Sequence, residues 1–102
     1  MSEKKKDAPA LVGDALQRFL DRSGLGERIE EAAVVPDWES RVGAGIGEVT
    51  TPVGVNNGTL FVAVRSSSWL MELKMMETEI LRRLNDGRDR GRIRKIRFFM
   101  AE

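Results

Sequence analysis

Acidic side chains are the first residues here that could do chemistry, because two carboxylates can act together as general acid and base. Two pairs lie close in the sequence, Glu30 with Glu31 and Asp37 with Glu39. Residues one or two positions apart do not face each other on a helix, so neither pair forms a natural dyad. The 102 residues include no His and no Cys, which removes imidazole bases, thiol nucleophiles and the usual zinc ligands. We therefore predict a protein that is not an enzyme and uses no cofactor or metal.

A run of glycines at Gly43, Gly45 and Gly47 is the nearest approach to a phosphate-binding loop. A phosphate-binding loop of that kind follows a strand and has the pattern Gly-x-Gly-x-x-Gly. This run follows a helical pattern instead and lacks the final glycine. We predict that it ends a helix and connects that helix to a strand.

Basic residues are concentrated in one segment. Residues 82–97 hold eight Arg and Lys against two Asp, a net charge of +6, whereas the rest of the chain sums to −5. Such polarity favours contact with a polyanion or with an acidic protein surface. The alternative is a solvated loop and edge strand whose charges oppose aggregation. The sequence alone leaves both interpretations open.

Aromatic and basic residues share the outer face of two predicted strands. Rings that stack on unpaired bases, beside cations that neutralise phosphates, are typical of proteins that bind single-stranded nucleic acid. In a three-stranded sheet, five residues would gather on one open face: Phe61, Arg65, Lys95, Arg97 and Phe99. Arg88, Arg90 and Arg92 precede the last strand and could extend this face through contacts with the nucleic-acid backbone. The alternative is that a helix or a second subunit covers Phe61 or Phe99.

A hairpin would position these strands. Asn57-Gly58 tolerates the positive φ angles of a two-residue type I′ turn. The cross-strand pairs that follow from this loop are Asn56–Thr59, Val55–Leu60 and Val53–Val62. This register puts the aliphatic residues of both strands on one face.

A helix is predicted after the hairpin. Ser66, Ser67 and Ser68 offer an N-cap, and the segment 85–87 offers a stop. Between them, apolar residues at helical spacing form one continuous arc: Trp69, Leu70, Leu73, Met76, Ile80, Leu81 and Leu84. Met71 and Met75 fall almost opposite this arc, so we expect them to face solvent or a partner. Glu77 lies inside the arc, and the sequence does not explain it.

Trp69 stands in the first turn of that helix, at the edge of its apolar arc. The simplest interpretation is a core residue between helix and hairpin, and the alternative is an anchor in a protein interface. Both interpretations are compatible for a half-buried ring.

Two helical patterns precede the hairpin. The first runs from about Pro9 to Gly24, with an apolar arc formed by Val12, Leu16, Phe19 and Leu20. The second begins near Glu27, and Pro36 must either kink it or start a new segment at Asp37. Trp38 and Val42 then share one helical face.

The complete pattern indicates one small α+β domain. With a last strand from about Ile93 to Met100, the element order is ααββαβ, which predicts a three-stranded sheet with helices packed on one face. Residues 1–8 are polar and predict a disordered lead, so the domain covers residues 9–102. No apolar run approaches the roughly 18 residues needed to cross a bilayer, and no signal core follows the N-terminal charges. We predict a cytoplasmic protein without membrane contact.

Three blocks of residues match a known family. The first is Trp38-x-x-x-Val42-Gly43 followed by Pro52. The second is Asn57-Gly58-x-Leu60-x-Val62-x-Val64-x-Ser66-x-x-Trp69-x-x-Glu72-Leu73. The third is Ile80-Leu81-x-x-Leu84-Asn85 with Ile93-x-x-Ile96-Arg97-Phe98. In these blocks the chain resembles the DciA family, bacterial proteins that recruit or operate the replicative DNA helicase, and the resemblance covers about Leu11 to Met100.

The resemblance implies a KH-like domain that binds DNA and contacts the hexameric replicative helicase, in the cytoplasm and at the nucleoid. Carried over by position, Trp69 matches the hallmark tryptophan of the family and Leu73 the leucine that follows it. Met71 and Met75 would complete a partner-binding surface around them. No small-molecule substrate is implied.

Two departures from the family pattern bear on nucleic-acid binding. Many members carry a long basic extension, whereas this chain offers only Lys4, Lys5 and Lys6 before the domain, so we expect weak DNA binding with a preference for single strands. RNA-binding KH domains grip the backbone with a Gly-x-x-Gly loop, which is missing here. Two alternatives stay open: an RNA- or ribosome-associated KH-like module, and a structural domain that self-associates, as a homodimer, through Met71 and Met75.

Overall fold

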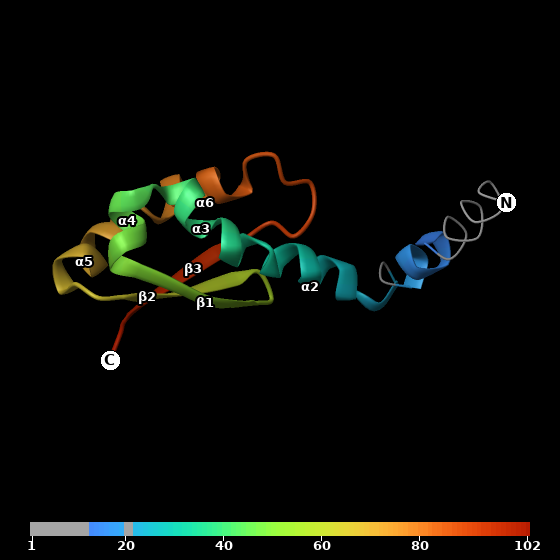
Figure 1. The fold of residues 1–102 in the computed structure, drawn as a ribbon, viewed down its shortest axis with the longest axis horizontal. Helices are drawn as coiled ribbons and strands as arrows, with labels where there is room; N and C mark the ends of the chain where they lie inside the picture. Colours follow the sequence, from blue (N-terminus) through green and yellow to red (C-terminus); the bar gives the residue numbers. More distant parts are fainter. Residues whose placement is uncertain (1–12, 20–21) are drawn as a thin grey trace, which may run out of the picture.

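A single sheet with helices on one side organises the molecule. The computed structural model describes residues 13–19 and 22–102 (Figure 1). The elements are α2 (Leu25–Ala32), α3 (Val34–Val42), α4 (Ala44–Val49), β1 (Thr50–Asn56), β2 (Thr59–Val64), α5 (Ser67–Met75), α6 (Glu77–Asn85) and β3 (Lys95–Met100). Helices α3 to α6 lie over one face of the sheet, while its other face carries no helix of the described residues (Figure 1). This arrangement confirms the predicted small KH-like α+β domain.

The sheet has the strand order β1-β2-β3. β1 pairs with β2 antiparallel, and β2 pairs with β3 parallel through the crossover formed by α5 and α6. On the helix-covered face, Leu60, Val62 and Val64 of β2 have no exposed surface. They pack with Ile96 and Phe98 of β3, so alternate residues of both strands enter the core as their period of two predicts.

The hairpin turn is the predicted one. Asn57 has φ +51° and Gly58 φ +79°, as a type I′ turn requires, and the pairs Asn56–Thr59 and Val55–Leu60 form as predicted. The predicted pair Val53–Val62 is wrong. Pro52 pairs with Val62 instead and Gly54 pairs with Phe61, so Val53 is the extra residue of a β-bulge and is 58% exposed. A bulge fits Pro52 on this edge strand.

Two consecutive buried hydrogen bonds lie at the edge of the core beside β1. The indole Nε1 of Trp38 donates to Thr50 Oγ1 at 2.8 Å, and that hydroxyl donates to the Ile46 carbonyl at 2.6 Å. Trp38 is 2% exposed, and Val42 shares its buried face. Because the ring meets both its apolar and its polar requirements here, Trp38 is a structural residue.

The predicted helix after the hairpin is divided in two at Met76. Ser66 caps α5 as expected, its hydroxyl accepting from the Trp69 N–H at 3.4 Å. Met76 leaves helical geometry, and α6 then starts at Glu77. The Glu77 carboxylate accepts from the Ile96 N–H at 2.9 Å. Glu77 therefore occupies the apolar arc because it satisfies a backbone donor of β3.

Two boundaries upstream also differ from the prediction. The second helical pattern breaks at Ala33, so α3 starts at Val34 and Pro36 lies in its first turn, where the missing N–H costs no hydrogen bond. Gly43 ends α3 with φ +97°, as predicted for the glycine run, but Ala44–Val49 then forms the short helix α4 before β1.

The N-terminal helices differ most from the expected packing. Residues 13–19 are helical and lie away from the sheet (Figure 1). Leu16 and Phe19, which belong to the predicted apolar arc, are 55% and 52% exposed, and Leu25 and Ile29 of α2 are also exposed. The predicted lead of residues 1–8, with Val12 and Leu20, lies outside the described residues.

Candidate functional site

One exposed surface lies on α5 and is called the α5 surface below; its residues are Ser68, Trp69, Met71, Glu72 and Met75. Ser68, Met71, Glu72 and Met75 adjoin one another at spacings of three and four along the helix, and Trp69 lies at the edge of this surface toward the core. Met71 is 68% exposed and Met75 81% exposed, which confirms their predicted outward direction. Ser68, Trp69 and Glu72 line a shallow depression on the same helix. An exposed pair of flexible methionine side chains can adapt to an apolar partner.

Trp69 and Leu73 differ in accessibility. Trp69 is half-buried and packs against the core, so its ring contributes to the core while part of it remains free for a partner. Leu73 has no exposed surface. Leu73 therefore supports α5 from within the core, and its side chain is not accessible at the surface.

The second surface is the open sheet face, formed by Phe61, Lys95, Arg97 and Phe99. Phe61 pairs with Arg97 and Ala63 pairs with Phe99 across β2 and β3. The two rings are therefore diagonal neighbours on the face opposite the helices, with Arg97 beside Phe61. Phe99 is 42% exposed and Phe61 is half-buried. The structure thus brings together four of the predicted nucleic-acid residues on an uncovered face.

Arg65 lies at the end of this face, immediately after β2. Its guanidinium donates to Thr51 Oγ1 at 2.7 Å and also to the Glu48 carbonyl. These bonds tie the side chain to the first residues of β1. Arg65 is exposed and keeps its positive charge at the rim of the open sheet face.

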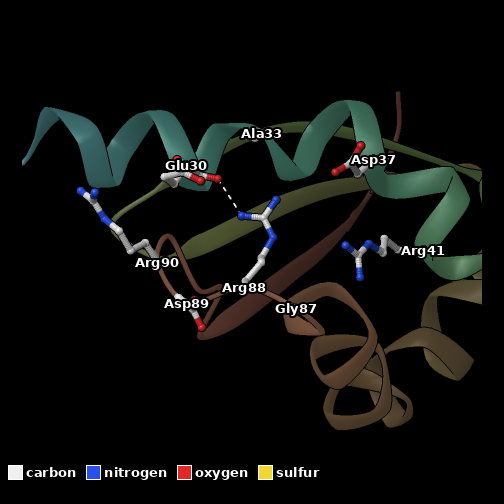
Figure 2. Close-up of a pocket in the computed structure, with 8 residues that line it drawn as sticks. All are labelled: Glu30, Ala33, Asp37, Arg41, Gly87, Arg88, Asp89 and Arg90. Atoms are coloured by element: carbon white, nitrogen blue, oxygen red, sulfur yellow. Dashed lines mark hydrogen bonds between the residues drawn. The ribbon is translucent and has the colours of Figure 1, made fainter. Parts of the chain in front are cut away.

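The loop arginines lie elsewhere, on the helix-covered side. Arg88 donates from Nη1 to the Glu30 carbonyl at 2.7 Å, and Arg90 approaches Glu27 with an Nε–Oε1 distance of 3.9 Å (Figure 2 shows the first contact). Arg92 donates from Nη1 to the Arg88 carbonyl at 2.9 Å. The structure therefore does not bring Arg88, Arg90 and Arg92 onto the open sheet face.

A cavity of about 400 Å³, called the loop cleft below, separates α2 and α3 from this loop. Its lining residues are Glu30, Ala33, Asp37, Arg41, Gly87, Arg88, Asp89 and Arg90 (Figure 2). Arg41 donates from Nη1 to the carbonyls of Asp86, at 2.9 Å, and Arg83, at 3.2 Å. Arg41 and Arg88 are thus both anchored by backbone carbonyls.

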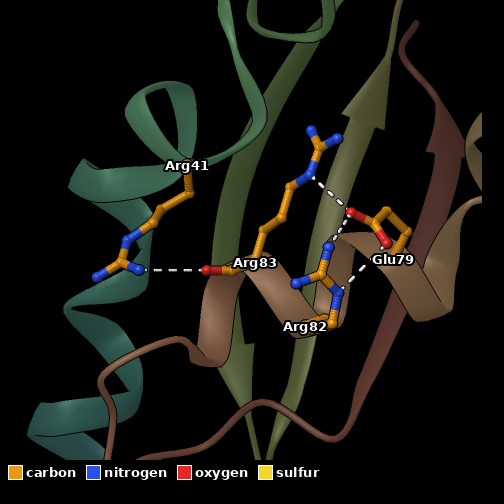
Figure 3. A network of polar contacts seen from close by, with 4 residues as sticks. All are labelled: Arg41, Glu79, Arg82 and Arg83. Carbon is orange, nitrogen blue, oxygen red and sulfur yellow. Dashed lines mark hydrogen bonds and ion pairs between the residues drawn. The ribbon is translucent and has the colours of Figure 1, made fainter.

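A network of charges lies on the outer side of α6 (Figure 3). Glu79 accepts from Arg82 Nη2 at 2.6 Å and from Arg83 Nε at 3.1 Å. The hydrogen bonds from Arg82, and next from Arg83, hold the pKa of the Glu79 carboxyl below its ordinary value. The same contact with Glu79 raises the pKa of Arg82.

Two features are absent from the described residues. Residues 13–19 and 22–102 contain no group of three acidic side chains placed to hold a metal ion. Within the same ranges, every helix is too short or too polar to cross a bilayer.

The sequence did not predict the hydrogen bond that attaches α2 to the loop before β3. The Gly91 N–H donates to Glu27 Oε2 at 2.7 Å, and Gly91 has φ +66°. The only signals in the sequence were the isolated Gly91 between basic residues and the acidic side of α2. Neither signal identifies its partner, because the two segments are more than 50 residues apart.

Comparison with known proteins adds a family and several relatives. The model of the family described as "Dna[CI] antecedent, DciA" matches residues 11–98. A UPF0232 protein of Mycolicibacterium smegmatis is 30% identical over 76 residues, which cover 74% of this chain and 39% of that protein. UPF0232 proteins of Mycobacterium leprae and Mycobacterium tuberculosis are 30% and 29% identical over the same length. The chain spans about two-fifths of the length of these curated relatives.

Proposed function

Because the chain belongs to the DciA family, we propose that it is an adaptor of bacterial DNA replication, which binds the hexameric replicative DNA helicase and assists its recruitment or loading onto DNA. It acts by contact in the cytoplasm, at the nucleoid, and catalyses no reaction. The observation that supports this proposal best is the α5 surface, where Met71 and Met75 are exposed and the half-buried Trp69 lies at the edge toward the core.

The α5 surface has the composition of a protein contact. Aromatic residues and methionine are enriched at the centre of protein interfaces, and a few such residues carry most of the binding free energy. The helix that presents them is fixed by the buried Leu73 and by the Ser66 cap. A rigid helix with flexible methionine side chains can bind without reordering its backbone.

Direct binding of single-stranded DNA is the second part of the proposal. Phe61 and Phe99 can stack on unpaired bases, while Lys95 and Arg97 can neutralise phosphates on the same face. Four residues are a small platform, in keeping with weak binding. The same chemistry suits single-stranded RNA, so competition between DNA and RNA oligonucleotides of equal length decides between this role and an RNA-associated module.

A pull-down with the cognate hexameric helicase tests the proposal. The intact chain should retain the helicase, whereas Met75→Glu should lose it because a charge then enters the apolar contact. Ala32→Glu is the matched control, since Ala32 is exposed on α2, which lies at the opposite end of the sheet from α5 (Figure 1). A chain that folds, fails to retain the helicase at micromolar concentration and sediments as a dimer would support the self-associating alternative instead.

A further inference from the structure

The loop cleft holds two guanidinium groups with unused hydrogen-bond donors. Arg41 and Arg88 each make their hydrogen bonds through Nη1 alone, and all of the acceptors are backbone carbonyls. A guanidinium has five N–H donors, so the Nε and Nη2 groups of both residues remain available. In the part of the chain that the structure describes, neither residue forms an ion pair.

Both cations are already ordered before any ligand binds. Arg88 is held between the carbonyls of Glu30 and Gly91, at 2.7 and 3.3 Å, and Arg41 is held by the end of α6. Figure 2 shows the two side chains between the helices and the loop. Ordering in advance lowers the entropy that a ligand must remove, and forked guanidinium donors match the oxygens of a phosphate.

We propose that the loop cleft binds a backbone phosphate of single-stranded DNA, with Arg41 and Arg88 as its ligands. This proposal rests on the DNA-binding part of the proposed function and adds a second contact to it. The loop that carries Arg88 leads directly into β3, where Lys95 begins the open sheet face. β3 is an edge strand, so a nucleic-acid strand that leaves the open sheet face and passes round this edge can follow the loop to the cleft on the helical side.

Acidic residues limit the strength of this site. Glu30, Asp37 and Asp89 also line the cleft, so its lining carries as many carboxylates as guanidinium groups. The positive potential in the cleft is therefore weaker than two arginines without acidic neighbours would give. A weak positive potential fits one phosphate contact in a weak and reversible complex. Asp37→Asn removes one opposing charge, and we expect it to tighten oligonucleotide binding about twofold.

The decisive test places a carboxylate in the cleft. Ala33→Glu puts a negative charge beside Arg88, whereas Ala32→Glu makes the same change on the adjacent exposed residue that does not line the cleft. Binding of an oligothymidylate, measured by fluorescence anisotropy across a salt series, should weaken about tenfold in Ala33→Glu and change less than twofold in Ala32→Glu. The negative slope of log affinity against log salt should become shallower by about 0.7 in Ala33→Glu alone, because one phosphate contact on a single strand contributes about that much to the slope.

Thermal unfolding of each variant checks that the fold is retained. Three results would then overturn the proposal. Equal weakening in Ala33→Glu and Ala32→Glu means that net charge alone matters and that the cleft takes no phosphate. Loss of binding in Phe99→Ala without any effect of Ala33→Glu leaves the open sheet face as the DNA contact and removes the cleft. No binding of the oligonucleotide by the unmodified chain removes the DNA-binding part of the proposed function and the cleft with it.

Discussion

Glu77 shows how one contact can override a local pattern. Its neighbours at helical spacing are apolar, yet its carboxylate accepts from the Ile96 N–H at 2.9 Å. A backbone donor at the edge of a sheet, partly shielded from water, costs free energy when it has no acceptor. The polar residue in the apolar arc therefore contributes to stability.

Glu77→Ala should destabilise the domain by about 1–3 kcal/mol, because the Ile96 N–H then loses its acceptor. Glu77→Gln is the control, since its amide oxygen can still accept the hydrogen bond and most of the stability should remain. Urea unfolding followed by circular dichroism measures both. Equal loss in the two variants would show that the carboxylate charge, and not the hydrogen bond, is what matters.

Glu79 should give the domain a small dependence on acid. Its pKa is lowered in the folded chain by Arg82 and Arg83, so its ionised form stabilises the fold above the ordinary glutamate pKa of about 4.3. This contribution disappears as the pH falls through the lowered folded-state value. Unfolding of Glu79→Gln and of the unmodified chain should therefore differ slightly at pH 7 and converge in acid. A difference that grows on acidification would contradict the assignment.

At the scale of elements, the sequence predicted those features that depend on neighbouring residues. The Asn57-Gly58 turn, the Ser66 cap and the alternation of β2 all depend on residues a few positions apart, and all are present. The role of Glu77 and the attachment of α2 depend on partners far along the chain, at Ile96 and Gly91. Periodicity carries no information on such partners. The outward direction of Met71 and Met75 was predictable because α5 keeps its helical spacing.

The loop after α6 meets α2 at Gly91, where no side chain fits. A Cβ on this residue would lie 2.4 Å from Glu30 Cβ, whereas a Cβ on Gly87 would meet nothing within 4 Å. Both glycines have positive φ, so replacing either one by alanine strains the backbone at a cost of about 1 kcal/mol. Gly91→Ala should cost clearly more than Gly87→Ala and should increase amide hydrogen exchange in α2. Equal unfolding free energies in the two variants would mean that the backbone near Glu30 moves to accept the new Cβ without loss of stability.

At the scale of the whole molecule, the sheet separates two surfaces. The α5 surface belongs to the helical layer, and the open sheet face looks away from it. Such separation allows one small domain to contact a protein and a nucleic acid at once. In the N-terminal helices, Leu16, Phe19, Leu25 and Ile29 are also exposed.

Trp69→Ala should affect both stability and partner binding, because the ring is half-buried against the core. We expect a loss of about 1–3 kcal/mol in unfolding free energy, less than for a fully buried aromatic residue. Met71→Ala should leave the unfolding free energy within about 0.5 kcal/mol, since its side chain is mostly exposed. Chemical denaturation separates the two cases, and a large loss in Met71→Ala would show that α5 packs differently.

The affinity of the intact chain for the cognate hexameric helicase tests the central claim most directly. Isothermal titration should give measurable binding for the unmodified chain and for Ala32→Glu. The dissociation constant should rise at least tenfold for Met75→Glu, with thermal unfolding unchanged in both variants. Equal binding by Met75→Glu and Ala32→Glu would contradict the account, because the α5 surface would then lie outside the contact with the helicase.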